Sequence, residues 1–135
     1  MHKNYELIAK TEKDILEIES GKGWASEHAM QAKYFQWLTL CYPQQRKLVF
    51  HVPNGGWRNK IEAIKMQAMG VIPGIPDIVN LSPLFTIELK AKNGVLSSEQ
   101  KEVKAIYAER GVNHYIVKED FLQFKSIFAA HLGGY

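Results

Sequence analysis

The sequence has little cysteine and no long hydrophobic run. Its single cysteine, Cys41, has no second thiol in the 135 residues with which to form an internal disulfide. Because Cys41 ends an apolar helical pattern beside Leu40 and Tyr42, we interpret it as a packing residue. No segment approaches the roughly 20 apolar residues of a membrane helix, and the N-terminus lacks the pattern of a secretory signal. We therefore expect a soluble, cytoplasmic protein without membrane contact, in the host cytoplasm if the protein is viral.

Motifs of several enzyme classes are also absent. Neither a G-x-x-x-x-G-K-[ST] loop nor a G-x-S-x-G elbow occurs, which removes the motif evidence for a nucleotide triphosphatase or a serine hydrolase. The histidines show no paired spacing and have no cysteine cluster nearby, which argues against a structural zinc site. They are His2, His28, His51, His114 and His131, of which His51 alone lies near the candidate site described below. The net charge of +3 is compatible with nucleic acid but does not single it out.

The chain has the length of one domain, and its hydrophobic periodicity predicts an α/β fold with a mixed sheet flanked by helices. Residues 1–23 are predicted to form a helical N-terminal extension that stops at a Gly-Lys-Gly turn. Residues 24–135 are predicted to form the domain that follows it. The predicted helices are 27–41, 59–68, 97–111 and 120–132, and the predicted strands are 47–52, 77–81, 84–91 and 114–117.

Two carboxylates and one lysine converge on the predicted hairpin of residues 77–91. Side chains alternate along a strand, so Glu88 and Lys90 share the face opposite to that of Phe85, Ile87 and Leu89. Asp77 opens the paired strand after Pro76. Mg²⁺ takes one or two protein carboxylates and leaves its other positions to water and phosphate, which suits phosphodiester hydrolysis. Lys90 would position or help deprotonate the attacking water, or stabilise the pentacoordinate phosphate, and the sequence does not separate these roles.

The same residues have a simpler reading. Glu88 and Lys90 can form a solvated cross-strand face, with Asp77 merely following a proline turn. The combination of Pro76-Asp77, ten intervening residues and a charged pair within an apolar strand favours the functional reading.

Pro76-Asp77 with Glu88-Leu89-Lys90 resembles the signature of the PD-(D/E)xK nuclease superfamily, and more narrowly the VRR-NUC family. The resemblance covers residues 27–111, and its further stretches are Glu27 with Gln31, residues 53–58, residues 70–77, Ala91 and residues 94–100. It implies a restriction-endonuclease-like core and a VRR-NUC-like nuclease domain over residues 24–135.

The resemblance also implies roles for individual residues. Asp77, Glu88 and the Leu89 carbonyl would bind Mg²⁺, for which Mn²⁺ would substitute, and Lys90 would act with the attacking water. Glu27 and Gln100 would complete the site. Each of these two has a structural alternative, because a carboxylate in the first turn of a helix complements its dipole and Ser97-x-x-Gln100 is a capping-box pattern.

Possible phosphate contacts lie outside this core. Asn54-Gly55-Gly56 would let backbone amides approach a phosphate, with Trp57, Arg58 and Lys60 adding a stacking surface and charge, although a plain turn explains the glycines equally well. Lys65, Lys101 and Lys104 read more simply as solvated helix faces.

Stand-alone members of the family look like resolvases of four-way (Holliday) junctions, so the resemblance favours a metal-dependent endonuclease on branched DNA, acting as a homodimer. Flap or nicked DNA is the alternative substrate. A non-catalytic nucleic-acid-binding module with the same fold is the alternative from another class, and the intact Asp77, Glu88 and Lys90 argue against it. A metal-free glycosidase built on the two carboxylates would give Lys90 no task.

Overall fold

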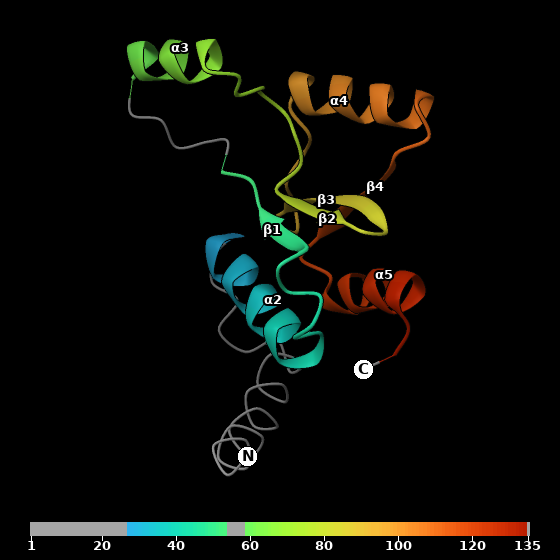
Figure 1. Cartoon of the computed structure of the whole chain (residues 1–135). Coiled ribbons are helices and arrows are strands. Elements are labelled where there is room, and N and C mark those ends of the chain that lie inside the picture. Colours follow the sequence, from blue (N-terminus) through green and yellow to red (C-terminus); the bar gives the residue numbers. More distant parts are fainter. Residues whose placement is uncertain (1–26, 54–58, 135) are drawn as a thin grey trace.

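The computed structural model describes residues 27–53 and 59–134, and the side chains of Glu27 and His28 are not described. The predicted extension over residues 1–23 lies outside these ranges. This part of the chain contains four helices and four strands, which are labelled in Figure 1. In chain order they are α2 (Glu27–Cys41), β1 (Val49–His51), α3 (Lys60–Ala68), β2 (Ile78–Leu81), β3 (Leu84–Lys90), α4 (Ser98–Glu109), β4 (Asn113–Lys118) and α5 (Phe121–Leu132).

The strands form one mixed sheet in the order β1-β2-β3-β4. The pairs β1–β2 and β2–β3 are antiparallel, whereas β3 and β4 are parallel and are joined by the crossover helix α4. Two parallel strands need such a crossover because a tight turn cannot connect them. The predicted α/β fold with a mixed sheet is confirmed.

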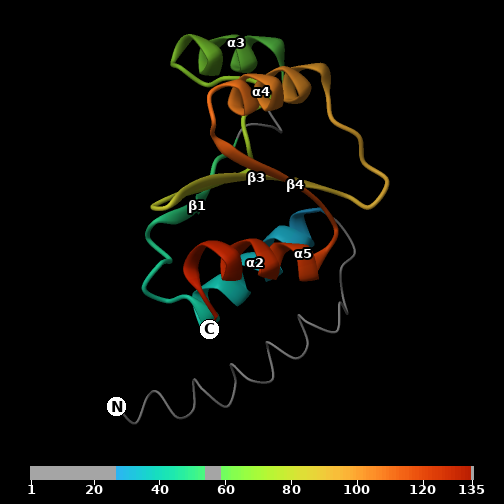
Figure 2. The same cartoon turned by 90° about the vertical axis from the view of Figure 1, so that its right-hand side faces the viewer.

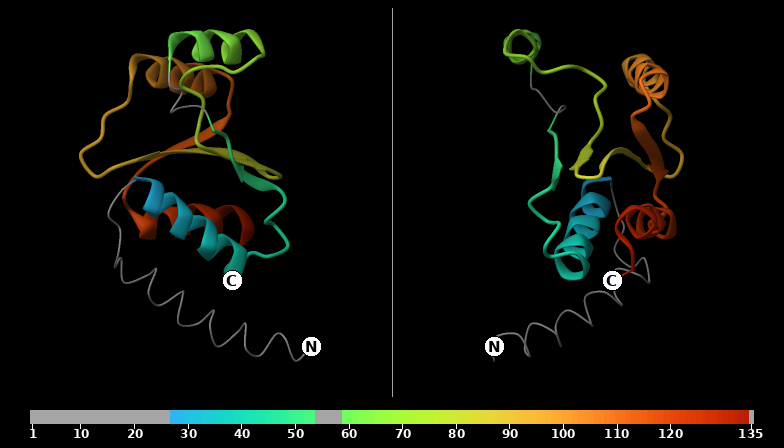
Figure 3. Two further views of the ribbon diagram at one scale, coloured as in Figure 1. Left: turned by 90° about the vertical axis from the view of Figure 1, so that its left-hand side faces the viewer. Right: turned by 45° about the vertical axis from the view of Figure 1, so that its right-hand side comes forward.

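Helices cover both faces of the sheet. Figures 2 and 3 show α2 and α5 on one side and α3 and α4 on the other. The core lies on the α2–α5 side, where the aromatic side chains of Tyr34 and Trp37 from α2 stack on or meet edge-on those of Phe124 and Phe128 from α5. Phe85, Ile87 and Leu89 of β3 are fully buried in this core. Cys41 packs against it, which confirms the packing interpretation of its thiol.

The sheet face opposite the core is more buried than the alternation of side chains along β3 alone predicted. Thr86 and Glu88 retain only 5% and 3% of their exposure, although they belong to the face opposite the core. On this face α4 packs along β4 and carries Tyr107 edge-on to the ring of His114, the register partner of Thr86. In contrast, α3 contains no buried residue.

Local sequence determines where several helices begin. Asn59 accepts a hydrogen bond from the Glu62 N–H at the start of α3, and Asp120 accepts one from the Gln123 N–H at the start of α5. Among the described residues, no helix is both long and apolar enough to cross a membrane.

Candidate active site

The candidate site begins where the chain enters β2. Asp77 is half-buried, and its Oδ2 accepts a hydrogen bond of 2.8 Å from the backbone N–H of Leu89. The Asp77 carbonyl accepts a second bond of 2.7 Å from the Val52 N–H and lies 2.9 Å from Nδ1 of His51. The backbone and the side chain of Asp77 are thus held by two different strands. Among the histidines whose side chains the structure describes, His51 is the one that contacts a candidate metal ligand.

Glu88 and Lys90 flank Leu89 on the face that α4 covers. Glu88 is only 3% exposed, which does not fit the alternative of a solvated cross-strand pair. Lys90 is half-buried, and its ammonium makes no ion pair with the part of the chain that the structure describes. Asp77 is therefore not its salt-bridge partner, since its carboxylate is turned toward the Leu89 amide instead.

The Leu89 carbonyl faces a gap in the β2–β3 ladder. In an antiparallel pair the N–H and C=O of one residue point to the same side, so this carbonyl points toward Asp77, as the Leu89 N–H does. The observed register pairs Ile78 with Ile87, and two further steps put Pro76 opposite Leu89. Proline has no N–H to offer. The carbonyl is consequently left without a ladder partner beside the two carboxylates.

The chemistry of this donor set fits a hard divalent cation. Two carboxylates and one backbone carbonyl are oxygen ligands of the type that Mg²⁺ prefers, with its remaining positions left for water and phosphate. Among residues 27–53 and 59–134, no larger group of three or more His, Cys, Asp or Glu side chains is arranged to hold a metal.

Gln100 lies in the first turn of α4 and forms the capping box that its spacing predicted. Its Oε1 accepts from the Ser97 N–H at 2.8 Å, while the Ser97 Oγ accepts from the Gln100 N–H at 3.1 Å. The neighbouring Glu99 has a pKa below its usual value, because its own backbone N–H and then the Ser98 hydroxyl stabilise the charged form. The capping role of Gln100 is confirmed. The cap uses the oxygen of the side-chain amide, and the amide nitrogen is left for other contacts.

Gly74 fixes the segment that leads into Asp77 against α4. Its φ is +84°, and a Cβ at this position would lie 2.5 Å from the Glu99 carbonyl carbon and 2.8 Å from the Gln100 nitrogen. No side chain fits that space, so only glycine allows the segment over residues 71–76 to touch the first turn of α4. The contact of Gly74 with α4 was not predicted, because the sequence carries no local signal for it.

The remaining predicted residues lie on α2, α3 and α4 or outside the described part of the chain. Figure 3 shows the N-terminal end of α2 beneath the sheet, but the Glu27 side chain and residues 54–58 lie outside the described part. Gln31 is half-buried on α2. Lys60, Lys65, Lys101 and Lys104 are exposed on α3 and α4, as expected for solvated helix faces.

A second polar pair on the same sheet face was also missed. The Thr86 Oγ1 lies 2.8 Å from His114 Nδ1, and the two residues are register partners on β3 and β4. Burial lowers the pKa of His114, and the charge of Lys104 lowers it further. Strand alternation puts Thr86 on the face of Glu88, but a parallel partner 28 positions along the chain cannot be deduced from local pattern.

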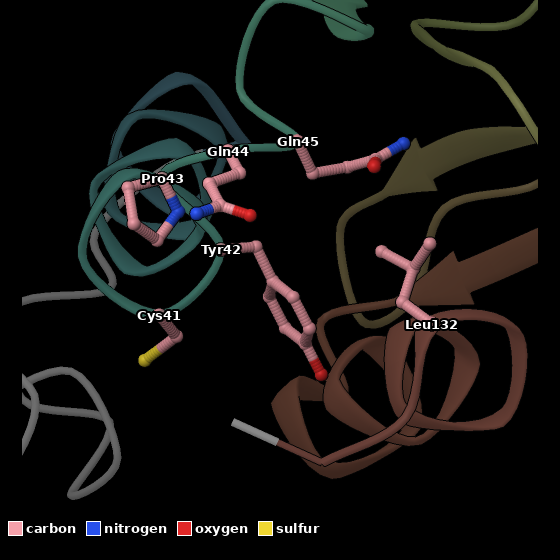
Figure 4. A pocket seen from close by; sticks show the side chains of 6 residues that line it. All are labelled: Cys41, Tyr42, Pro43, Gln44, Gln45 and Leu132. Carbon is pink, nitrogen blue, oxygen red and sulfur yellow. The ribbon is translucent and has the colours of Figure 1, made fainter.

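A pocket of about 340 Å³ lies at the opposite end of the strands (Figure 4). It is lined by the turn after α2 and by Leu132, and Figure 4 shows the Tyr42 ring directed between them. Tyr42 donates its hydroxyl proton to the Gly133 carbonyl, and Gln45 donates to Asn80 and to the Ser82 carbonyl at the hairpin turn. These contacts tie the turn after α2 to the end of α5 and to the β2–β3 hairpin, and no carboxylate or lysine lines the pocket.

The mixed sheet, its two helical layers and the site at the end of β3 define an α/β protein with a restriction-endonuclease-like core. A solved structure named "VRR_NUC domain protein" is similar to this chain, with a TM-score of 0.64 and 21% sequence identity. The similarity covers 78% of this chain and 87% of that chain. Neither a scan against protein-family models nor a search of curated proteins gives a match.

Proposed function

We propose that this protein is a Mg²⁺-dependent endodeoxyribonuclease whose site consists of Asp77, Glu88, the Leu89 carbonyl and Lys90. The observation that carries the proposal is the hydrogen bond of 2.8 Å from the Leu89 N–H to the Asp77 carboxylate. It brings the carboxylate of β2 to the Glu88-Leu89-Lys90 segment of β3. The fold shared with the VRR_NUC domain protein supports the same conclusion.

Each residue has a task that its surroundings suit. Glu88 is buried and offers a fixed carboxylate, whereas Asp77 keeps one oxygen beyond the bond to Leu89. A bound Mg²⁺ would lower the pKa of a coordinated water and polarise the phosphoryl oxygen. Lys90 makes no ion pair with any described residue, so its ammonium is available to orient the attacking water. Glu27 and Gln100 complete the site in this proposal.

We propose branched DNA, such as a four-way junction, as the preferred substrate, and a homodimer as the active form. A junction has two strands to cut, and two sites related by a twofold axis match them. A domain of this size also gains contact area on DNA by pairing with a second copy. Sedimentation of the protein with and without junction DNA tests the dimer separately from the chemistry.

The test of the chemistry is cleavage of labelled four-way-junction DNA and of linear duplex in the presence of Mg²⁺. Lys90→Ala and Asp77→Asn proteins run in parallel, and a chelator is the control. We expect cleavage of the junction by the wild type, its loss with chelator, and a loss of at least about 100-fold in both variants, as for other groups that act on the transition state.

The outcomes separate the parts of the proposal. Equal cleavage of all DNAs would retain the nuclease and reject the junction preference. Tight DNA binding without cleavage in Mg²⁺ or Mn²⁺ would reject the nuclease in favour of a binding module. Thermal unfolding of both variants checks that they are folded.

A further inference from the structure

A second lysine lies beside Lys90 at the end of the sheet. Lys118 is the last residue of β4, and the parallel register pairs it directly with Lys90, the last residue of β3. Directly opposed residues of neighbouring strands point to the same face, and adjacent strands are about 4.8 Å apart. Val117 is fully buried in the core, so Lys118 points to the opposite face, which is that of Glu88 and Lys90.

The backbone holds Lys118 in this position. Gln123 of α5 donates its side-chain N–H to the Ile116 carbonyl at 3.1 Å and thereby ties the end of β4 to the next helix. Glu119 then adopts a φ of +50°, a conformation that residues other than glycine rarely occupy. The chain turns sharply at this point, so the strand ends with Lys118 at the edge of the sheet.

Lys118 forms no ion pair with the acids that follow it. It is exposed, and its ammonium makes no ion pair within residues 27–53 and 59–134. The carboxylate of Asp120 instead accepts the Gln123 N–H at the start of α5. Two neighbouring ammonium groups that have no ion pair among the described residues repel each other unless an anion lies between them.

We propose that Lys118 binds the DNA phosphate next to the scissile one, and so extends the active site along one strand of the substrate. The inference rests on the proposed nuclease site, because Lys90 marks the position of the scissile phosphate. A neighbouring phosphate is bound equally in the ground state and the transition state. Lys118 therefore determines affinity and register along the strand and leaves the chemical step to Lys90.

The experiment compares Lys118→Gln and Lys118→Arg with a matched control, Lys47→Gln. Lys47 is an exposed lysine that precedes β1, at the opposite end of the parallel strands from Lys90. Binding of labelled duplex to the full chain is measured by fluorescence anisotropy over a series of salt concentrations, with chelator present so that no DNA is cut. Cleavage with Mg²⁺ is measured separately to obtain kcat and KM.

For Lys118→Gln we expect the slope of log K against log salt to become shallower by about 0.9, the value for one phosphate contact on duplex DNA. KM should rise while kcat stays near that of the wild type. Lys118→Arg, which keeps the charge, should restore most of the slope, and Lys47→Gln should change neither quantity.

Two results would overturn the inference: a salt slope of Lys118→Gln equal to that of Lys47→Gln, or a fall in kcat with KM unchanged. The proposed nuclease can fail separately. If the wild type cuts no DNA but Lys118→Gln still has the shallower salt slope, the phosphate contact is retained and the nuclease is rejected.

Discussion

At the scale of single residues, the site combines side chains that also have structural tasks. Asp77 is a candidate metal ligand and the acceptor of a backbone N–H at the same time. Gln100 caps α4 with its amide oxygen. When one side chain serves both purposes, substitution by alanine removes both, and a variant that preserves the structural contact is the more informative test.

Gln100→Glu separates the two tasks of Gln100. A glutamate at this position keeps an oxygen for the Ser97 N–H, because Ser-x-x-Glu is an equally good capping box. We expect the free energy of unfolding to change by less than about 0.5 kcal/mol. The cleavage rate should fall by about tenfold or more, since a hydrogen-bond donor is replaced by a negative charge near the phosphate, and tenfold corresponds to about 1.4 kcal/mol. Urea unfolding and junction cleavage measure the two quantities.

Ser97→Ala is the complementary control. It removes the hydroxyl that accepts from the Gln100 N–H, and we expect a loss of about 1 kcal/mol in stability, as for other lost helix caps. If Gln100→Glu cleaved DNA as fast as the wild type, Gln100 would be a capping residue alone.

At the scale of elements, the proposed site draws on three segments: the 71–76 segment with Asp77, the end of β3 and the first turn of α4. Gly74 is the contact between the first and the third of these. The segment can lie this close to α4 only without a side chain, and this closeness brings Pro76 and Asp77 to the same end of the sheet as Gln100.

Gly74→Ala should therefore disturb the site as well as the fold. The added Cβ would meet backbone atoms of Glu99 and Gln100, which cannot rotate away, so overpacking should cost about 1–3 kcal/mol beyond the backbone strain. Gly70→Ala is the matched control, because Gly70 also has a positive φ, of +108°, but has open space around it. Its cost should be near 1 kcal/mol, that of the strain alone.

Chemical denaturation measures the difference between these two variants. Equal destabilisation would contradict the packing role of Gly74. We also expect Gly74→Ala to lose more cleavage activity than Gly70→Ala. The Cβ added at position 74 forces α4 and the 71–76 segment apart, whereas the one added at position 70 meets nothing.

The sequence predicted most of the elements, for identifiable reasons. Helix 27–41 has the predicted bounds, and the hairpin follows from two apolar strands around Ser82-Pro83. The starts of α3 and α4 follow from the caps Asn59 and Ser97. β1, β2 and β3 are one to three residues shorter than predicted, whereas β4 is two residues longer, since strand ends depend on partners and not on propensity.

What the sequence could not predict depends on contacts between distant residues. The parallel pairing of β3 with β4 sets the neighbours Thr86–His114 and Lys90–Lys118, and no periodicity encodes that register. Asp77, Glu88 and Lys90 were predictable as a group because all three belong to one hairpin. Gly74 and Lys118 were not, because each acquires its importance through a separate element.

At the scale of the whole molecule, the burial of His114 makes stability depend on pH. Burial, and secondarily Lys104, lower its pKa from the ordinary value of 6.5. The unfolded chain then takes up a proton near pH 6.5, before the folded protein does. Stability that is present above this pH is lost as the pH falls from about 6.5 toward the lower pKa of the folded state.

His114→Gln should weaken this dependence. We expect the free energy of unfolding of the wild type to fall more steeply than that of His114→Gln between about pH 7.5 and pH 5.5. Urea unfolding at several pH values measures both curves, and His51→Gln, which replaces an exposed histidine, is the control. Parallel curves for the wild type and His114→Gln would show that His114 does not titrate differently in the folded state.

The end of the β2–β3 ladder has a consequence for the kind of surface this molecule presents. Pro76 lies opposite Leu89 but has no N–H to donate to the Leu89 carbonyl. The Leu89 N–H is bound by the Asp77 side chain in place of a backbone carbonyl. The β2–β3 ladder therefore ends at this point, with the Leu89 carbonyl and the Asp77 carboxylate at its end. The proposed metal ligands are therefore located where the regular pairing of β2 with β3 stops.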